Sequence, residues 1–108
     1  MQRKMLLGFL LLLPVGCQEL AEFPHREDYA FLRSVQKGWT EAQIRTKLGV
    51  PHAEHKAGTP PSVYCIEGRF CHERAITGKL LIYIRGEPTA FYFLDSSGKV
   101  EHVFVGGS

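Results

Sequence analysis

Two cysteines six positions apart, Cys65 and Cys71, are the residues of this chain best suited to chemistry. They enclose five residues, and in an oxidising compartment such a pair typically forms a structural disulfide around a small loop. A redox-active pair is an alternative, although the spacing is not Cys-x-x-Cys. Zinc binding together with His52, His55 and His72 is another, although no zinc-finger spacing is present. Haem attachment at Cys71-His72 would need Cys-x-x-Cys-His, which the sequence lacks.

Catalysis has little support in the sequence. It contains no Gly-x-Ser-x-Gly motif, no glycine-rich phosphate loop and no metal-binding helix motif. His102 falls within a predicted strand, where we expect it at the surface or at an interface. We therefore expect a protein that is not an enzyme, with no cofactor and no bound metal.

The third cysteine, Cys17, ends an N-terminal segment with the features of an export signal. Basic residues near Met1 precede an apolar run over 6–16 that is too short to span a bilayer, and Gly16 stands just before the cysteine. Residues 1–16 resemble a bacterial lipoprotein signal peptide, in which the cysteine is acylated and becomes the new N-terminus. Gln18 follows instead of the aspartate that usually signals retention in the inner membrane. The resemblance therefore implies an outer-membrane lipoprotein facing the periplasm, whereas ordinary secretion, with Cys17 free or paired, is the alternative.

The length and composition of the remaining chain indicate one small domain without the clustered positive charge that binds nucleic acid. Removing residues 1–16 from the 108 leaves 92, enough for one domain of modest stability. Lys+Arg falls from 13 to 11 and equals the 11 Asp+Glu, so the mature chain is formally neutral. Because nucleic-acid binding needs clustered positive charge, we expect no nucleic-acid partner.

The first part of the mature chain predicts a tether and two short helices. Residues 17–27 form the acylated cysteine and a flexible tether. A helix is predicted over 28–37, with Asp28 as its N-cap and Gly38 in the left-handed position after it.

A second helix is predicted over 41–48, with both ends specified. Thr40 and Gln43 have the spacing of a capping box, and Trp39 and Ile44 that of a hydrophobic staple. Ile44 pairs with Leu48 on the next turn; Gly49 and Pro51 then end the helix. Two turns of helix are too short to persist alone, so this helix must pack on another element.

The rest of the chain predicts an antiparallel sheet. Strands are expected over 62–66, 79–85, 89–94 and 99–105, with Gly98 closing the last hairpin. The fold class is α+β, with the helices on one sheet face. The other face is expected to be apolar and exposed, which usually indicates a partner.

The segment 35–51 resembles the SmpA/OmlA (BamE-like) domain. The residues that carry the resemblance are Gly38, Trp39, Thr40, Gln43, Ile44, Leu48, Gly49 and Pro51. The segment 91–100 is similar to the closing hairpin of that family, so the resemblance covers 28–105. It implies two short helices packed on a three- to four-stranded antiparallel sheet, the β-lactamase-inhibitor-like arrangement. Trp39 stands where methionine is common, and 65–78 departs from the family pattern.

The resemblance implies a non-enzymatic outer-membrane lipoprotein, attached to the membrane through Cys17. It would be an accessory or scaffold component for outer-membrane protein assembly or envelope integrity, with a protein partner. The alternative is a protein-inhibitor or ligand-binding module of the β-lactamase-inhibitor-like fold. If Cys65 and Cys71 pair, the bridge would preorganise Phe70 as a contact for the partner.

Overall fold

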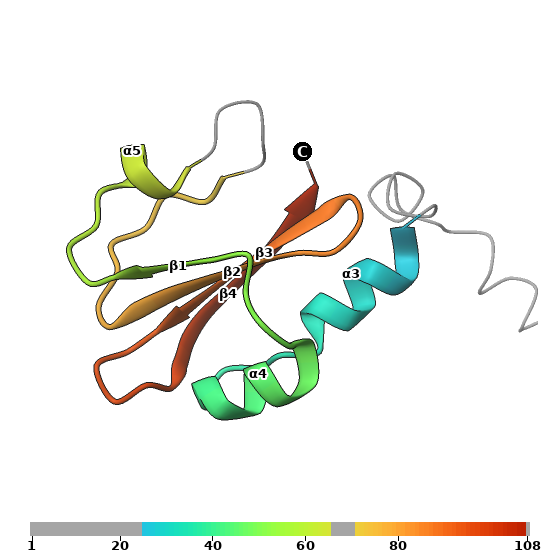
Figure 1. The fold of residues 1–108 in the computed structure, drawn as a ribbon, viewed down its shortest axis with the longest axis horizontal. Helices are drawn as coiled ribbons and strands as arrows, with labels where there is room; N and C mark the ends of the chain where they lie inside the picture. Colours follow the sequence, from blue (N-terminus) through green and yellow to red (C-terminus); the bar gives the residue numbers. More distant parts are fainter. Residues whose placement is uncertain (1–24, 66–70, 108) are drawn as a thin grey trace, which may run out of the picture.

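The computed structural model describes residues 25–65 and 71–107, which form a mixed helix and sheet fold (Figure 1). Its four-stranded antiparallel sheet has the order β1-β2-β3-β4. The elements in chain order are α3 (Arg26–Arg33), α4 (Glu41–Leu48), β1 (Ala53–Lys56), α5 (Pro61–Tyr64), β2 (Lys79–Ile84), β3 (Pro88–Leu94) and β4 (Val100–Gly107). Residues 1–16, Cys17 and most of the predicted tether lie outside the described residues.

Helix α3 begins two residues before the predicted start and ends four residues before the predicted end. Its N-cap is His25, whose side chain makes no capping bond, and Asp28 lies in the first turn instead. The Asp28 carboxylate accepts a hydrogen bond from Arg85 Nε at 3.1 Å, so a long-range ion pair takes the place of the predicted cap. At the other end, the Ser34 hydroxyl donates to the Phe31 carbonyl, which satisfies an acceptor that a longer helix would have used.

Helix α4 has the predicted bounds and the predicted capping box. The Gln43 amide donates to the Thr40 hydroxyl, and the Gln43 side chain accepts from the Thr40 amide at 2.8 Å. Ile44 is fully buried, and Trp39 packs against the cluster that contains it. Leu48 is only half-buried and packs at the margin of that cluster. The core contact of this short helix is therefore Ile44.

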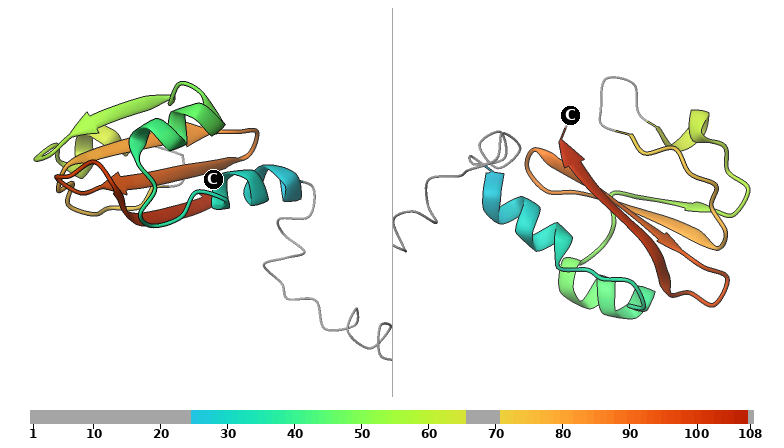
Figure 2. Two further views of the ribbon diagram at one scale, coloured as in Figure 1. Left: turned by 90° about the horizontal axis from the view of Figure 1, so that it is seen from below. Right: turned by 180° about the vertical axis from the view of Figure 1, so that it is seen from behind.

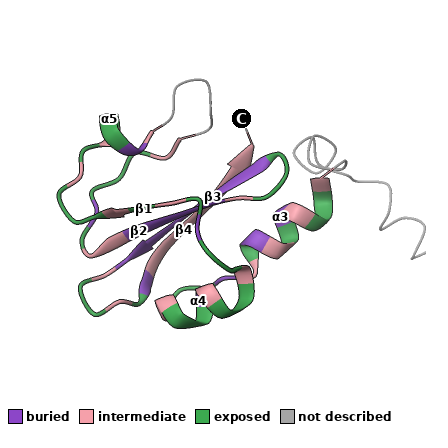
Figure 3. Ribbon diagram, viewed as in Figure 1, coloured by how far each residue is buried: buried purple, intermediate pink, exposed green. Residues whose placement is uncertain are grey.

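The sheet has two apolar faces, and each is covered by a different part of the chain. On one face Leu81, Tyr83 and Tyr92 pack against Leu32 of α3 and Ile44 of α4. Figure 2 shows these two helices on one side of the sheet and α5 on the other. Strand β3 is buried along its whole length because both faces are covered (Figure 3).

The second face contradicts the expectation of an exposed apolar surface. Leu80, Ile82 and Phe93 form a cluster with Tyr64 of α5 and Ile76, and both cysteines pack against it. Tyr64, Ile76 and the two cysteines therefore cover this sheet face. Residues 66–70, including Phe70, lie outside the described residues.

The strand predicted over 62–66 is wrong. Pro61–Tyr64 is a single helical turn, with Pro61 at the first position, where proline is best tolerated. The strand at this edge of the sheet is β1, which pairs with β2 from Ala53↔Ile82 to Lys56↔Lys79. Its sequence, Ala-Glu-His-Lys, has no β-branched residue, so propensity gives no signal for it.

Candidate functional site

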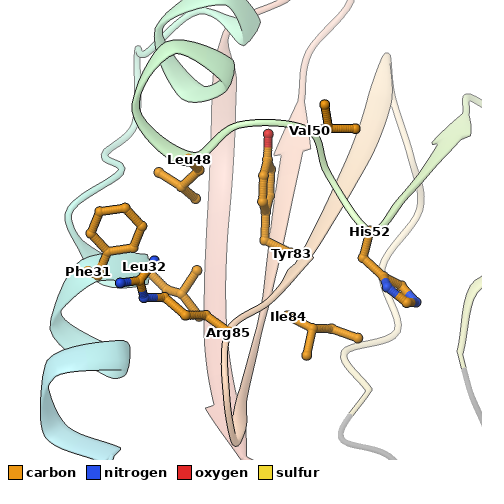
Figure 4. Close-up of a pocket in the computed structure, with 8 residues that line it drawn as sticks. All are labelled: Phe31, Leu32, Leu48, Val50, His52, Tyr83, Ile84 and Arg85. Atoms are coloured by element: carbon orange, nitrogen blue, oxygen red, sulfur yellow. The ribbon is translucent and has the colours of Figure 1, made fainter.

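A groove lies between α3, the C-terminal end of α4, the segment 49–52 and the end of β2 (Figure 4). Its volume is about 300 Å³. The lining residues are Phe31, Leu32, Leu48, Val50, His52, Tyr83, Ile84 and Arg85. Four separate elements thus contribute to one concave surface.

The floor of the groove is rigidly held. Leu32 and Tyr83 are buried, and the Tyr83 hydroxyl donates to the Gly49 carbonyl at 2.8 Å. Burial raises the pKa of Tyr83, so this phenol stays neutral at physiological pH. The bond fixes Gly49, whose φ of 86° re-aims the chain after α4 toward β1.

The mouth of the groove is apolar and exposed. Val50 is 85% exposed, the highest value among the exposed large hydrophobic side chains of the described residues. Leu48, Phe31 and Ile84 beside it are half-buried. Covering such exposed apolar side chains with a partner lowers the free energy of the complex.

Two cations stand at the rim of the groove. The Arg85 guanidinium lies 4.0 Å from the centre of the Phe31 ring and also pairs with Asp28. Lys47 Nζ lies 5.9 Å from the same ring and 5.6 Å from the Trp39 ring. Within the described part of the chain Lys47 makes no ion pair, so the rim carries an unbalanced positive charge. The groove therefore suits an apolar side chain that is flanked by a carboxylate.

On the opposite sheet face, Cys65 and Cys71 lie at disulfide distance. Their Cα atoms are 5.4 Å apart, within the usual range, and the structure records the bond. The Tyr64 hydroxyl donates to the Arg74 carbonyl at 2.7 Å and accepts from the Arg74 amide at 2.9 Å. These two bonds hold the backbone at Arg74 against the Tyr64 side chain over the sheet.

Next to the disulfide, His72 and His102 form a direct contact. Their Nε2 atoms are 3.0 Å apart, and the His72 ring stacks on Phe104 with 3.8 Å between ring centres. Burial lowers the pKa of both imidazoles, and the charge of Arg74 lowers it further. Both rings are therefore neutral at pH 7.

A separate cluster of charged side chains joins α4 to β1 and β2; it consists of Glu41, Arg45, Glu54 and Lys79. Arg45 bonds to Glu41 at 2.8 Å and to Glu54 at 2.6 Å, and Lys79 bonds to Glu41 at 3.0 Å. The hydrogen bond from Arg45 is the main cause of a lowered pKa of Glu54. Each charge here has opposite partners, so the cluster serves to connect elements rather than to bind a ligand.

The histidines weighed as zinc ligands do not gather around the cysteines. His55 packs on the Tyr64 ring, His52 lines the groove on the other face, and His72 contacts His102. Among residues 25–65 and 71–107, no group of three or more potential ligands is arranged to hold a metal ion.

Two residues of the helical motif contribute to the groove, whereas the sequence did not predict most of its lining. Leu48 lines the groove, and Gly49 accepts the Tyr83 bond that closes its floor. Phe31, Val50 and Arg85 come from segments far apart in the chain, so no local sequence pattern predicts that they form one site. His72 and His102 are likewise 30 residues apart. Cys17 and Phe70 lie outside the described residues.

Comparison with protein-family models, with characterised proteins and with solved structures gives no match for this chain. The likeness to the SmpA/OmlA domain therefore stays an interpretation of the residues at 35–51 and 91–100. None of the helices in the described ranges is long and apolar enough to cross a membrane.

Proposed function

We propose that this chain is a non-enzymatic outer-membrane lipoprotein that faces the periplasm and binds a protein partner. Its role is that of an accessory or scaffold component in outer-membrane protein assembly or envelope integrity. The signal-like segment ending at Cys17 supports the lipid anchor. Two helices that precede a sheet and pack on one of its faces support the BamE-like, β-lactamase-inhibitor-like arrangement.

The groove is the observation that supports partner binding most directly. Val50, exposed at 85%, is one of the residues that line this concavity of about 300 Å³. Covering one valine side chain fully is worth about 1.5–3 kcal/mol, so Val50 alone can contribute substantially to a contact.

The charges at the rim define the partner's chemistry. Lys47 and Arg85 flank the Phe31 ring, and Arg85 also pairs with Asp28. The partner is therefore a protein segment that inserts a bulky apolar side chain and places an aspartate or glutamate next to it. Charge complementarity of this kind selects the partner and its orientation more than it adds affinity.

A photo-crosslinking amino acid at Val50 of the full chain tests this assignment in living cells. The matched control carries the same group at Val63, which is also exposed but lies on α5, on the opposite face. We expect a specific adduct at position 50 that Lys47→Glu/Arg85→Glu abolishes, and a crosslinked peptide with an apolar residue beside an acidic one. Equal adducts at both positions, an adduct insensitive to charge reversal, or crosslinking to lipid alone would show that the groove is not the partner site.

Cell fractionation of Cys17→Ser tests the anchor separately. Serine offers no thiol for acylation, so the variant should leave the outer-membrane fraction after a high-salt wash. Retention of the variant in that fraction would contradict the lipid anchor. An adduct at Val50 together with such retention would keep the partner site and remove only the lipid.

A further inference from the structure

The two imidazoles on the second sheet face meet tip to tip. The ring centres of His72 and His102 are 5.0 Å apart while their Nε2 atoms are 3.0 Å apart, and the ring planes differ by only 23°. Each Nε2 therefore points at the other. This is the geometry of a hydrogen bond in which one Nε2–H donates and the other Nε2 accepts.

Two imidazoles alone do not complete a zinc site, which takes four protein ligands, or three and a water. In the part of the chain that the structure describes, no group of three or more potential ligands is arranged to hold a metal ion. The 3.0 Å contact is therefore interpreted as a hydrogen bond in which the two rings share a proton.

Protonation decides whether this contact can exist. A neutral pair provides one donor and one acceptor, and so does a pair that carries one extra proton. When both rings are protonated, both Nε2 atoms carry hydrogen and no acceptor remains. Two positive charges then face each other across the former bond.

The surroundings oppose that second charge. The positive charges of Arg74, two residues after His72, and of Lys37, between α3 and α4, disfavour protonation of His102. The negative charge of Glu101 on β4 favours it. The Arg74 Nη2 atom lies 3.5 Å from Glu101 Oε2, so this ion pair partly neutralises the carboxylate. The aromatic rings of Phe104 and Phe93 on the other side of His72 offer no hydrogen-bond acceptor for a second charge.

The contact joins two parts of the fold. His72 directly follows Cys71 in the segment that covers the second sheet face, and His102 is in β4. We propose that His72 and His102 form an acid-sensitive latch, which holds residues 71–76 on β4 at neutral pH and releases them when both rings are protonated. Release uncovers Phe93 and Phe104, which pack beneath the segment. The latch is on the face opposite the groove and does not depend on the proposed function.

The sign of the effect follows from the lowered pKa values. The unfolded or released state binds protons at the ordinary imidazole pKa of about 6.5, while the latched state resists them. The latch is therefore fully effective above that pH and loses stability as the pH falls below it. Below that pH the released state binds more protons than the latched state. For each pH unit over which this difference is one proton, the population of the released state should rise about tenfold.

Histidine NMR and hydrogen exchange on the full chain in detergent micelles test the latch. Between pH 7.5 and pH 5, we expect His72 and His102 to titrate in two coupled steps, the second below the ordinary range. After correction for intrinsic exchange, the Arg74 amide, which donates to the Tyr64 hydroxyl, should lose protection by about tenfold or more through that second step.

His102→Gln and His72→Gln provide the decisive comparison. Glutamine can still hydrogen-bond to the remaining imidazole but cannot acquire the second charge, so each variant should keep its protection at pH 5. His55→Gln, outside the pair, should behave like the unsubstituted chain. Independent titration of the two rings near the ordinary pKa, or an equal loss of protection in the unsubstituted chain and both pair variants, would overturn the proposal.

Discussion

Replacing Tyr64 by phenylalanine should reveal how the segment over the second sheet face is held. The Tyr64 ring is 1% exposed, and phenylalanine keeps the ring and its packing, so no cavity forms. The substitution removes two hydrogen bonds to the Arg74 backbone, at 2.7 and 2.9 Å. At about 1 kcal/mol net for each bond, the expected cost is about 2 kcal/mol.

Tyr83→Phe is the matched control, because the Tyr83 hydroxyl makes a single bond, to the Gly49 carbonyl. Its expected cost is about 1 kcal/mol, half that of Tyr64→Phe. For a domain of this size, 1 kcal/mol lowers Tm by about 4–8 °C, so Tyr64→Phe should lower it by about 8–16 °C. Urea unfolding followed by the fluorescence of Trp39, the single tryptophan, measures both variants with the disulfide intact.

A Tyr64→Phe variant no less stable than Tyr83→Phe would refute this reasoning. It would mean that water replaces the hydroxyl at Arg74 at no net cost, and that the disulfide and apolar contacts alone hold the segment. The measured slope of unfolding free energy against urea should be the same for both variants, since neither changes the buried surface much.

Four other substitutions test the helical side and the polar cluster that connects it to the sheet. Thr40→Ala should cost about 1 kcal/mol of unfolding free energy in urea, because the capping bond to the Gln43 amide is lost. Ile44→Ala should cost about 2–5 kcal/mol, and half-buried Leu48→Ala clearly less; the reverse order in the same assay would contradict the assignment of Ile44 as the core contact. The lowered pKa of Glu54 means that its pairing stabilises the fold above the ordinary carboxyl pKa of 4.5 and is lost as the pH falls through the folded-state value. Glu54→Gln should therefore flatten the decline in urea midpoint between pH 7 and about pH 3.5, and an unchanged decline would rule out this contribution.

Only part of the site could be inferred before the fold was known. Leu48 and Gly49 belong to a helix whose ends are set by neighbouring residues, and both contribute to the groove. Phe31, Val50 and Arg85 have no such local signature, because an exposed valine or an aromatic residue in a helix is common in any surface. They become a site only when α3, the 49–52 segment and β2 are brought together.

The sequence by itself determined the local structure in which a few adjacent residues satisfy one another. The capping box of Thr40 and Gln43 sets the start of α4, and the strands at 79–84 and 88–94 follow from dense β-branched and aromatic residues. Gly98, with a φ of 84°, closes the last hairpin as its position predicts. The residues that set these features are neighbours in sequence, although the start of α4 also bonds to the last hairpin, where the Glu41 amide donates to the Gly98 carbonyl.

Tertiary structure decided every feature whose partner is distant in sequence. Asp28 pairs with Arg85 instead of capping a helix, and Pro61–Tyr64 becomes a helical turn because Tyr64 is buried against the second sheet face. Strand β1 exists because the exposed edge of β2 offers unpaired backbone groups, although its own residues have little strand propensity. The free energy of such long-range contacts exceeds the few tenths of a kcal/mol that separate local propensities, so the fold and not the local sequence chooses the outcome.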